Sequence, residues 1–193
     1  IQAYKDCEKL CNYIHLPVQS GSTDILKRMN RKYTKDEYFL LIEKLKAAVP
    51  EIAITTDFIV GFPGETEEDF KETLDLVKRV RFDSAFTFLY SIRKGTPAEN
   101  YTDQVPEAVK HERFNRLVDL LNEIALEKNK ACEGRILRVL VEGPSKTDSK
   151  TFTGRTDSAK IVNFKGSSDL EGQIIHVKIT EGKTFSLFGE ILT

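Results

Sequence analysis

The chain has 193 residues, of which 40% are hydrophobic and 31% are charged, and its formal net charge is -1. This composition indicates a globular protein with room for one moderate domain and a small second one. No apolar run is long enough to span a membrane and no segment resembles a signal peptide, so we expect no membrane partner. Because the chain begins with Ile1 rather than Met, we expect it to be a fragment of a longer protein.

The first 104 residues alternate between strand-like and helix-like patterns. The strands are expected at 13–18, 52–60 and 82–90, and the main helices at 35–48 and 67–80. Ser22 is expected to cap a short helix, while Thr34 with Glu37 and Thr66 with Asp69 have the spacing of capping boxes. Alternation of this kind predicts an α/β fold with a parallel sheet. Three such strands are too few to close a barrel, which again suggests that part of the domain is missing.

A different pattern follows a long helix that is expected over about 106–132. Five short, alternating segments separated by turn residues are strand-like: 136–141, 151–156, 160–164, 174–180 and 185–192. This spacing predicts a small antiparallel β-barrel, a fold that often binds oligonucleotides. We therefore divide the chain into residues 1–129 and residues 130–193.

Asp57 is unusual because it is a carboxylate inside an otherwise apolar strand. We expect that strand to be buried on both faces, where an unpaired charge would be costly, so a polar partner is required. The strand ends at Gly61, and the carboxyl ends of parallel strands are where α/β proteins bind ligands.

Gln19 follows the first strand and is expected at the same edge of the sheet as Asp57. Together with the cationic fork of Arg31, these side chains have the chemistry to hold a ligand with a carboxylate and vicinal hydroxyls, such as an amino-acid nucleoside. The alternative is structural: Arg31 and Asp57 form an ion pair, and Gln19 caps a strand end.

The three cysteines are too few for a disulfide framework, which suits a reducing cytoplasm. Cys7 and Cys11 have the first spacing of an iron–sulfur motif, but Ile14 stands where a third cysteine would be needed. Both cysteines are spaced to share one helix face, so we favour a structural role.

Four ordered motifs carry a resemblance to a known family: HLPVQSGS at 15–22, LKRMNRKYT at 26–34, TTDFIVGFPGETEEDF at 55–70 and FLYSIRKGTPA at 88–98. They resemble the second half of the radical S-adenosylmethionine barrel of methylthiotransferases. The sequence from about 130 resembles the TRAM domain, an OB-like barrel, that ends those enzymes. The resemblance implies a partial (β/α) barrel whose enzyme cleaves S-adenosylmethionine (SAM) at a 4Fe–4S cluster and inserts a methylthio group into a C–H bond.

The resemblance also implies roles for particular residues. Gln19, Arg31 and Asp57 match positions that contact the methionyl part and the ribose of SAM in related barrels. The Tyr-Ser-x-Arg-x-Gly-Thr pattern that contains Arg93 is similar to the tRNA-modifying branch, and a cation there suits RNA phosphate. Arg155 and Lys160 are the corresponding candidates for RNA contacts in the TRAM part.

We therefore expect the tRNA branch, which modifies N6-isopentenyladenosine next to the anticodon, with the anticodon stem-loop and an electron donor as partners. The alternatives are the ribosomal-protein branch of the same family and an RNA-binding module without catalysis. The Cys-x3-Cys-x2-Cys motif of the family is absent, so the cluster ligands are expected outside this chain. The chain should then hold no metal and no catalytic residue, and it should be inactive alone.

Overall fold

The computed structural model describes residues 1–145, 148 and 151–192. It divides the chain into two compact units: residues 14–122 with Ile1, and residues 2–13 with 123–193. Thr193, which the predicted second domain includes, lies outside the described residues. In the described part of the chain, no helix is long and apolar enough to cross a membrane.

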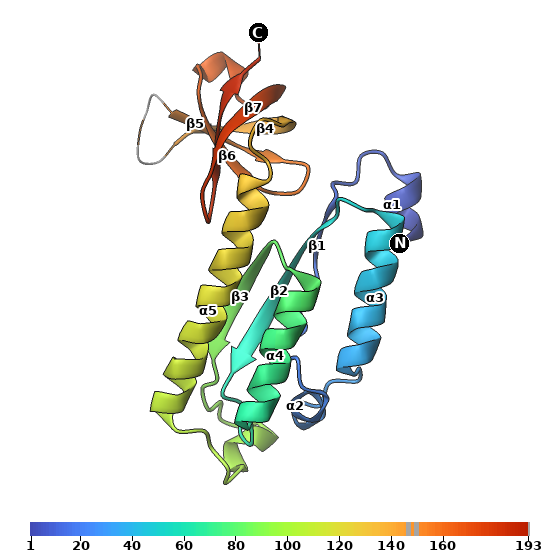
Figure 1. Ribbon diagram of the computed structural model, residues 1–193, viewed down its shortest axis with the longest axis vertical. Coiled ribbons are helices and arrows are strands. Elements are labelled where there is room, and N and C mark those ends of the chain that lie inside the picture. Colours follow the sequence, from blue (N-terminus) through green and yellow to red (C-terminus); the bar gives the residue numbers. More distant parts are fainter. Residues whose placement is uncertain (146–147, 149–150, 193) are drawn as a thin grey trace. The chain divides into compact units, whose positions relative to one another are not determined.

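The sheet of the first unit has the strand order β1, β2, β3 (Figure 1). Its strands are β1 (Tyr13–His15), β2 (Ala53–Val60) and β3 (Ser84–Leu89), and the helices are α2 (Thr23–Arg28), α3 (Lys35–Ala48) and α4 (Glu67–Val80). β2 and β3 run parallel with Asp57 opposite Phe86. The predicted alternation is thus confirmed, although β1 is shorter than the expected strand 13–18.

The helices α2, α3 and α4 begin at the positions that their capping residues predicted. Thr34 accepts a hydrogen bond from the Glu37 amide, and the Glu37 side chain accepts one from the Thr34 amide, so this capping box is complete. Thr66 and Asp69 form the second box at the start of α4. Each box satisfies main-chain donors that a helix N-terminus otherwise leaves unpaired. Ser22 caps α2 through the Ile25 amide, also as predicted.

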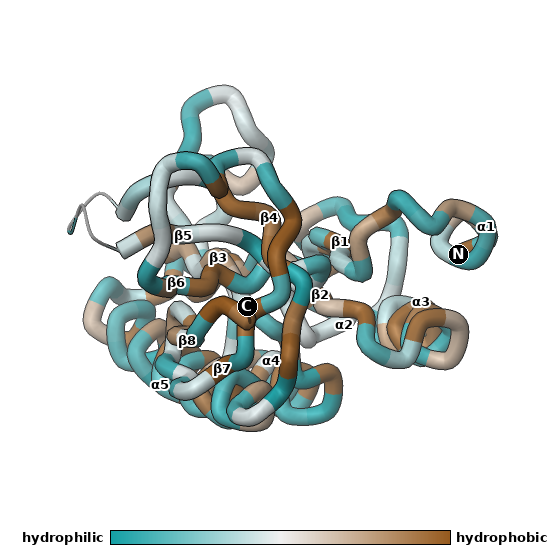
Figure 2. The backbone as a smooth tube through the Cα atoms, turned by 90° about the horizontal axis from the view of Figure 1, so that it is seen from above, coloured by the Kyte–Doolittle hydropathy of each residue, from teal (hydrophilic) through white to brown (hydrophobic). Residues whose placement is uncertain are grey.

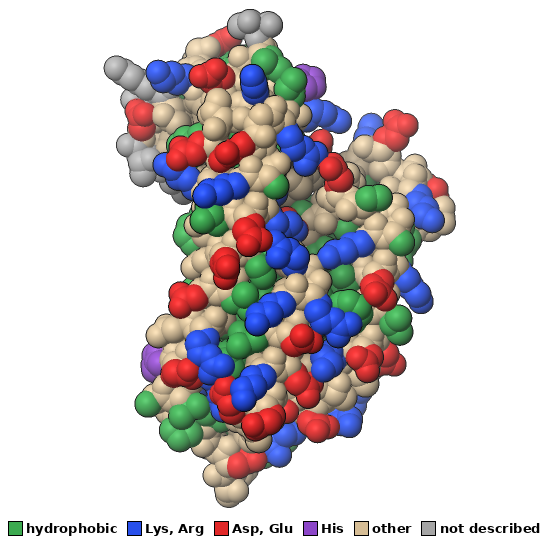
Figure 3. All heavy atoms as spheres, in the orientation of Figure 1, with side chains coloured by type: hydrophobic (Ala, Val, Ile, Leu, Met, Phe, Trp, Pro, Cys, Tyr) green, Lys and Arg blue, Asp and Glu red, His purple; other side chains and the backbone are tan. Residues whose placement is uncertain are grey.

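Helices α3 and α4 lie on one face of the sheet (Figure 1). Phe58 of β2 and Phe70 of α4 are fully buried there, with Ile42 of α3 almost so. Leu41 of α3, by contrast, is 39% exposed. Figure 3 shows basic and acidic side chains interspersed over the solvent face of these helices, an ordinary mixed-charge surface.

The second unit contains a closed five-stranded barrel in the order β4, β5, β6, β8, β7. Its strands are β4 (Ile136–Pro144), β5 (Thr151–Thr156), β6 (Ile161–Lys165), β7 (Ile174–Gly182) and β8 (Leu187–Ile191). Val139, Val162 and Val177 are completely buried in its core, and the apolar stretch of β4 stands out in Figure 2. The predicted barrel is confirmed with one correction: β6 and β8 pair in parallel, because the strand that closes the barrel returns in the same direction.

The remaining elements are helical. They are α1 (Gln2–Asp6), the long α5 (Glu107–Lys130) and two short 3-10 helices, η1 (Pro97–Asn100) and η2 (Ser168–Leu170). The predicted long helix is confirmed, and Gly134 follows it with a positive φ of 80°. Because α1 ends at Asp6, Cys7 and Cys11 lie outside any helix, and the prediction that they share a helix face is wrong.

Candidate functional site

Asp57 lies on the face of the sheet that α3 and α4 do not cover. Its neighbour Phe58 is fully buried against the helices, whereas the Asp57 side chain keeps 24% of its surface exposed. The expectation that this strand is buried on both faces is met only in part: Thr55, on the same face as Asp57, is 7% exposed, but that face becomes accessible at Asp57. Phe86, directly opposite Asp57 on β3, is likewise exposed.

The polar partner that Asp57 requires is His15. Asp57 Oδ1 lies 3.3 Å from His15 Nε2, and the other ring nitrogen, Nδ1, lies 2.9 Å from Thr55 Oγ1. Within the described residues, Asp57 Oδ2 has no hydrogen-bond or ion-pair partner. Sequence reasoning missed His15, although its position at the end of the neighbouring strand was a usable signal.

Gln19 is joined to β2 through its main chain. Its amide donates to the Asp57 carbonyl at 2.9 Å, and its carbonyl accepts from the Ile59 amide at the same distance. The main chain of Gln19 is left-handed, with φ of 71°, a conformation that few residues other than glycine adopt. Its side-chain amide makes no hydrogen bond to another described residue. The structure thus brings Gln19 and Asp57 together, as predicted.

Arg31 makes no direct contact with Gln19 or Asp57. It is exposed, and its guanidinium makes no hydrogen bond or ion pair with any residue that the structure describes, so the alternative of a structural Arg31–Asp57 pair is not observed. Arg31 does act on Tyr33: burial raises the pKa of the Tyr33 phenol, and the positive charge of Arg31 partly opposes this. The Tyr33 hydroxyl donates to the Val18 carbonyl at 3.2 Å, directly before Gln19.

The turn after β2 packs against α5. Gly61 has φ of 75°, and a Cβ atom built on it would lie only 2.3 Å from Lys110 Cγ. The Lys110 amine donates to the Tyr90 carbonyl at 3.2 Å, and the Tyr90 ring packs edge-on against Phe62 with centroids 5.0 Å apart. Lys110 therefore connects the turn after β2 with the end of β3.

Glu65 and Arg113 form a buried ion pair at the same turn. Arg113 Nη1 lies 3.0 Å from Glu65 Oε1, and this carboxylate oxygen also accepts from the Gly61 amide at 3.0 Å. Burial raises the pKa of Glu65 to about 6, although the Gly61 amide and the Arg113 charge both act to lower it. Sequence reasoning missed this pair, since Arg113 looks like any polar residue of an amphipathic helix.

Asp69 links the loop after β1 to the helix after β2. Its Oδ1 accepts from the Ser22 hydroxyl at 2.6 Å, and its Oδ2 accepts from the Thr66 amide and hydroxyl. Burial acts to raise the pKa of Asp69, but the hydrogen bonds from Ser22 and Thr66 outweigh it and lower the pKa overall. The two loops that the sequence placed at one edge are thus tied together.

Arg93 follows β3 in a tight turn. It is exposed, and its carbonyl accepts from the Thr96 hydroxyl at 2.8 Å. Its guanidinium has no ion-pair or hydrogen-bond partner in the described part of the chain. The structure does not connect it with Gln19, Arg31 or Asp57.

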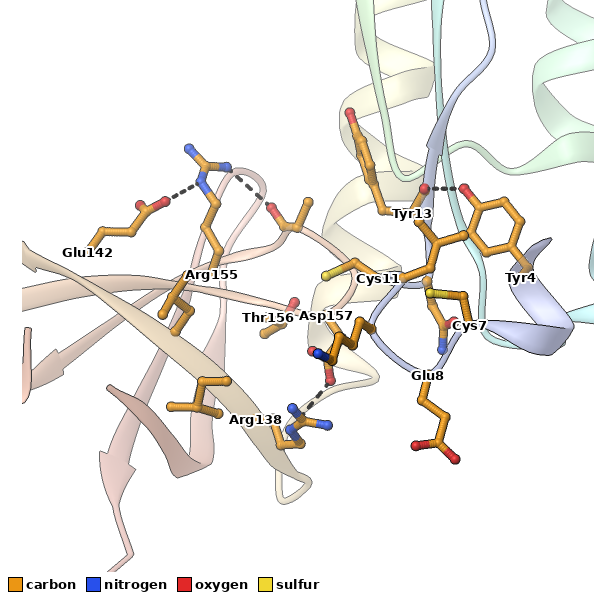
Figure 4. A pocket seen from close by; sticks show the side chains of 16 residues that line it. Tyr4, Cys7, Glu8, Cys11, Tyr13, Arg138, Glu142, Arg155, Thr156 and Asp157 are labelled. Carbon is orange, nitrogen blue, oxygen red and sulfur yellow. Dashed lines mark hydrogen bonds and ion pairs between the residues drawn. The ribbon is translucent and has the colours of Figure 1, made fainter. Parts of the chain in front are cut away.

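A cavity of about 710 Å³ lies within the second unit, between the segment 4–13 and the strands β4, β5 and β7 (Figure 4). Two arginines line it, and both are paired with acids. Arg155 Nε lies 2.8 Å from Glu142 Oε1, and Arg138 Nε lies 4.0 Å from Asp157 Oδ2. The predicted RNA contact Arg155 is exposed at this wall, whereas the predicted site residues of the first unit do not line the cavity.

Lys160, the other predicted RNA contact, is engaged inside the second unit. Its amine donates to Asn129 Oδ1 at 2.8 Å, and the Asn129 amide donates in turn to the Lys183 carbonyl at 2.6 Å. The lysine therefore links the end of α5 to the barrel. No group of three His, Cys, Asp or Glu side chains among the described residues has the arrangement of a metal site.

Comparison with known families agrees with both units. Residues 1–77 match the Radical SAM superfamily, and residues 130–192 match the TRAM domain. Among solved structures, the chain is similar to coproporphyrinogen III oxidase from Escherichia coli, described as a radical SAM enzyme. That similarity has a TM-score of 0.50 at 13% identity, over 94% of this chain and 46% of the oxidase, so it supports the fold alone.

Curated relatives are much closer in sequence. Proteins named tRNA-2-methylthio-N(6)-dimethylallyladenosine synthase are 60% identical over 98% of this chain in Clostridium botulinum and in Clostridium tetani. The protein of that name from Clostridium novyi is 55% identical over the whole chain. In each case the chain spans 42% of the relative's length. The matches therefore assign residues 1–77 to the Radical SAM superfamily and residues 130–192 to the TRAM domain.

Proposed function

We propose that this chain supplies the SAM-binding edge and the RNA-binding domain of a tRNA methylthiotransferase. The whole protein would add a methylthio group to C2 of N6-isopentenyladenosine next to the anticodon. The observation that carries this proposal is the 60% identity to synthases of that name over 98% of the chain. The division into residues 1–129 for the first domain and 130–193 for the second is part of the same proposal.

Three polar groups of the first unit fit a nucleoside that carries an amino acid. Asp57 Oδ2, the side-chain amide of Gln19 and the Arg31 guanidinium have no partner among the described residues, so each is available to a ligand. Ribose hydroxyls donate to Asp57, and the methionyl carboxylate binds Arg31. The chemistry that SAM and its 4Fe–4S cluster supply when bound is radical attack on an unactivated C–H bond.

The cysteines of this chain do not fit an iron–sulfur cluster. Cys7 and Cys11 are exposed and Cys132 is buried in the barrel core. A 4Fe–4S cluster requires three or four thiolates at one place. We therefore assign the cluster ligands, and the contact with an electron donor, to other parts of the whole protein. The chain alone is expected to show no turnover.

The RNA contacts are assigned to Arg93, Arg155 and Lys160, with the anticodon stem-loop as the partner. Arg93 has a free guanidinium within the described residues and suits a phosphate directly. Arg155 shares its charge with Glu142, and the Lys160 amine binds Asn129. We therefore expect the Arg93→Ala substitution to lower the salt dependence of tRNA binding more than Arg155→Ala does.

Hydrogen exchange of the whole protein tests the nucleoside site. SAM should protect the amides of Gln19 and Ile59, and Asp57→Ala should abolish that protection. Asp24→Ala is the matched control, because Asp24 is an exposed surface aspartate whose one ion-pair partner among the described residues is Lys27, at 3.3 Å. If SAM protects the Asp57→Ala variant as well as the parent, the assignment of this site is wrong.

Product analysis separates the alternative functions. The whole protein should methylthiolate tRNA and leave ribosomal protein unmodified. Modification of a ribosomal protein would place it in the other branch. RNA binding without SAM binding or turnover would show that the protein is an RNA-binding module without catalysis.

A further inference from the structure

We propose that His15 is a positioning residue of the nucleoside site, which holds one oxygen of Asp57 so that the other faces the ligand. This inference rests on the proposed function, because it concerns how Asp57 meets the ribose. It assigns no chemistry to His15 itself.

The two contacts of the ring indicate which tautomer the neutral ring adopts. Asp57 Oδ1 is negatively charged and lies 3.3 Å from Nε2, so a hydrogen on Nε2 is favoured over a lone pair at that position. In the neutral ring, Nδ1 is then an acceptor, and the Thr55 hydroxyl at 2.9 Å must donate to it. Thr55 and Asp57 are two residues apart on β2 and therefore share one face of the strand. β2 thus fixes both nitrogens of the ring.

A third strand supports the ring from the side. Phe86 of β3 stands opposite Asp57 in the sheet register and meets the His15 ring edge-on, with centroids 6.1 Å apart and an interplanar angle of 74°. His15, Asp57 and Phe86 therefore form a row across three neighbouring strands. Phe86 is 63% exposed, so the row lies open to a ligand.

The fold does not need the ring for strand pairing. The Leu16 amide donates to the Thr55 carbonyl at 2.8 Å, and the Gln19 amide donates to the Asp57 carbonyl. These main-chain bonds hold the segment after β1 to β2 whichever side chain occupies position 15. The ring instead orients the partly exposed carboxylate of Asp57. A side chain that is oriented in advance loses less conformational freedom when it binds a ligand.

Two substitutions separate orientation from other roles. His15→Phe keeps a ring against Phe86 but removes the donor, whereas His15→Gln keeps an N–H donor at a similar distance from the main chain. In equilibrium dialysis with the whole reconstituted protein, His15→Phe should weaken SAM binding roughly tenfold. His15→Gln should recover most of that loss, and both variants should unfold at the parent temperature.

The outcomes distinguish this inference from the proposed function. If Asp57→Ala abolishes SAM binding while His15→Phe binds like the parent, only the role of His15 is overturned. If His15→Gln binds as poorly as His15→Phe, the ring contacts the ligand itself and the positioning role is also overturned. If Asp57→Ala leaves SAM binding unchanged, the proposed site and this inference fall together.

Nitrogen NMR of the chain tests the geometry without any ligand. At alkaline pH, where histidine rings are neutral, His15 should be the Nε2–H tautomer, and Asp57→Asn should shift its Nε2 resonance. His15→Phe identifies the signal among the three histidines of the sequence. An Nδ1–H tautomer, or a resonance that ignores Asp57→Asn, would contradict the proposal.

Discussion

Arg113 donates to both the main-chain carbonyl and the carboxylate of Glu65, at 2.9 and 3.0 Å. Both residues are buried, with 5% and 6% of their surfaces exposed. Helix α5, which carries Arg113, thereby fixes the turn that ends β2. Because Gly61 and Glu65 share a hydrogen bond in this turn, the pair also fixes the strand end that carries Asp57.

Removing Arg113 should be far more costly than removing its neighbour on the exposed side of α5. Arg113→Ala leaves a buried carboxylate unpaired, so we expect the free energy of unfolding to fall by about 3 kcal/mol. Arg116→Ala is the matched control, because Arg116 is 38% exposed in its surface pairs with Glu67 and Glu112, and its loss should stay below about 1 kcal/mol. Urea unfolding of the two variants measures the difference, and equal losses would refute it.

The raised pKa of Glu65 should make stability depend on pH. Burial raises this pKa from 4.5 to about 6, so the folded state binds the proton more tightly than the unfolded state does. Stability is therefore greatest below pH 4.5 as far as this group is concerned, and it is lost as the pH rises through 6. The expected loss is about 2 kcal/mol relative to Glu65→Gln, which cannot ionise.

The measurement is the difference in free energy of unfolding between the parent and Glu65→Gln at pH 4.5 and at pH 7.5. Taking the difference cancels the other titrating groups. A parent that gains stability over Glu65→Gln as the pH rises would show that attraction to Arg113 outweighs burial.

The elements that were predicted correctly are those defined by local sequence. Thr34 with Glu37 and Thr66 with Asp69 each lie within four residues, and both boxes formed where they were expected. The partner of Asp57 could not be found in that way, because His15 is 42 positions away and meets Asp57 only when β1 lies beside β2. The parallel pairing of β6 and β8 is also a property of barrel closure and not of either strand.

The candidate site shows the same division. The sequence identified Gln19 and Asp57 as neighbours at one sheet edge, and their main chains are hydrogen-bonded. It did not identify Glu65 with Arg113, since a charged residue on a helix is usually exposed. Burial of that pair follows from how α5 packs against the turn, which no spacing within the helix reveals.

The two capping boxes should contribute differently to the free energy of unfolding, because among the described residues only the α4 box makes a tertiary hydrogen bond. Asp69→Ala removes the side-chain half of the α4 box and also the hydrogen bond from Ser22, so we expect a loss of about 2 kcal/mol. Glu37→Ala removes only the equivalent half of the α3 box and should cost about 0.5 kcal/mol. Thermal unfolding of the two variants compares them, and a Glu37→Ala loss as large as that of Asp69→Ala would show that Ser22 adds nothing.

Gly61 and Gly95 allow backbone strain to be separated from packing. Their φ angles are similar, 75° and 79°, so an alanine at either position suffers a comparable left-handed strain of about 1 kcal/mol. They differ in surroundings: a Cβ on Gly61 meets Lys110 Cγ at 2.3 Å, whereas one on Gly95 finds no atom within 4 Å.

We therefore expect Gly95→Ala to lose about 1 kcal/mol and Gly61→Ala to lose at least about 2 kcal/mol, since Lys110 must leave its buried position. A displaced Lys110 no longer reaches the Tyr90 carbonyl, so amide exchange around Tyr90 should also increase in Gly61→Ala but not in Gly95→Ala. Urea unfolding and hydrogen exchange measure the two effects. Equal losses with unchanged exchange at Tyr90 would mean that the lysine moves aside freely and does not connect the two strand ends.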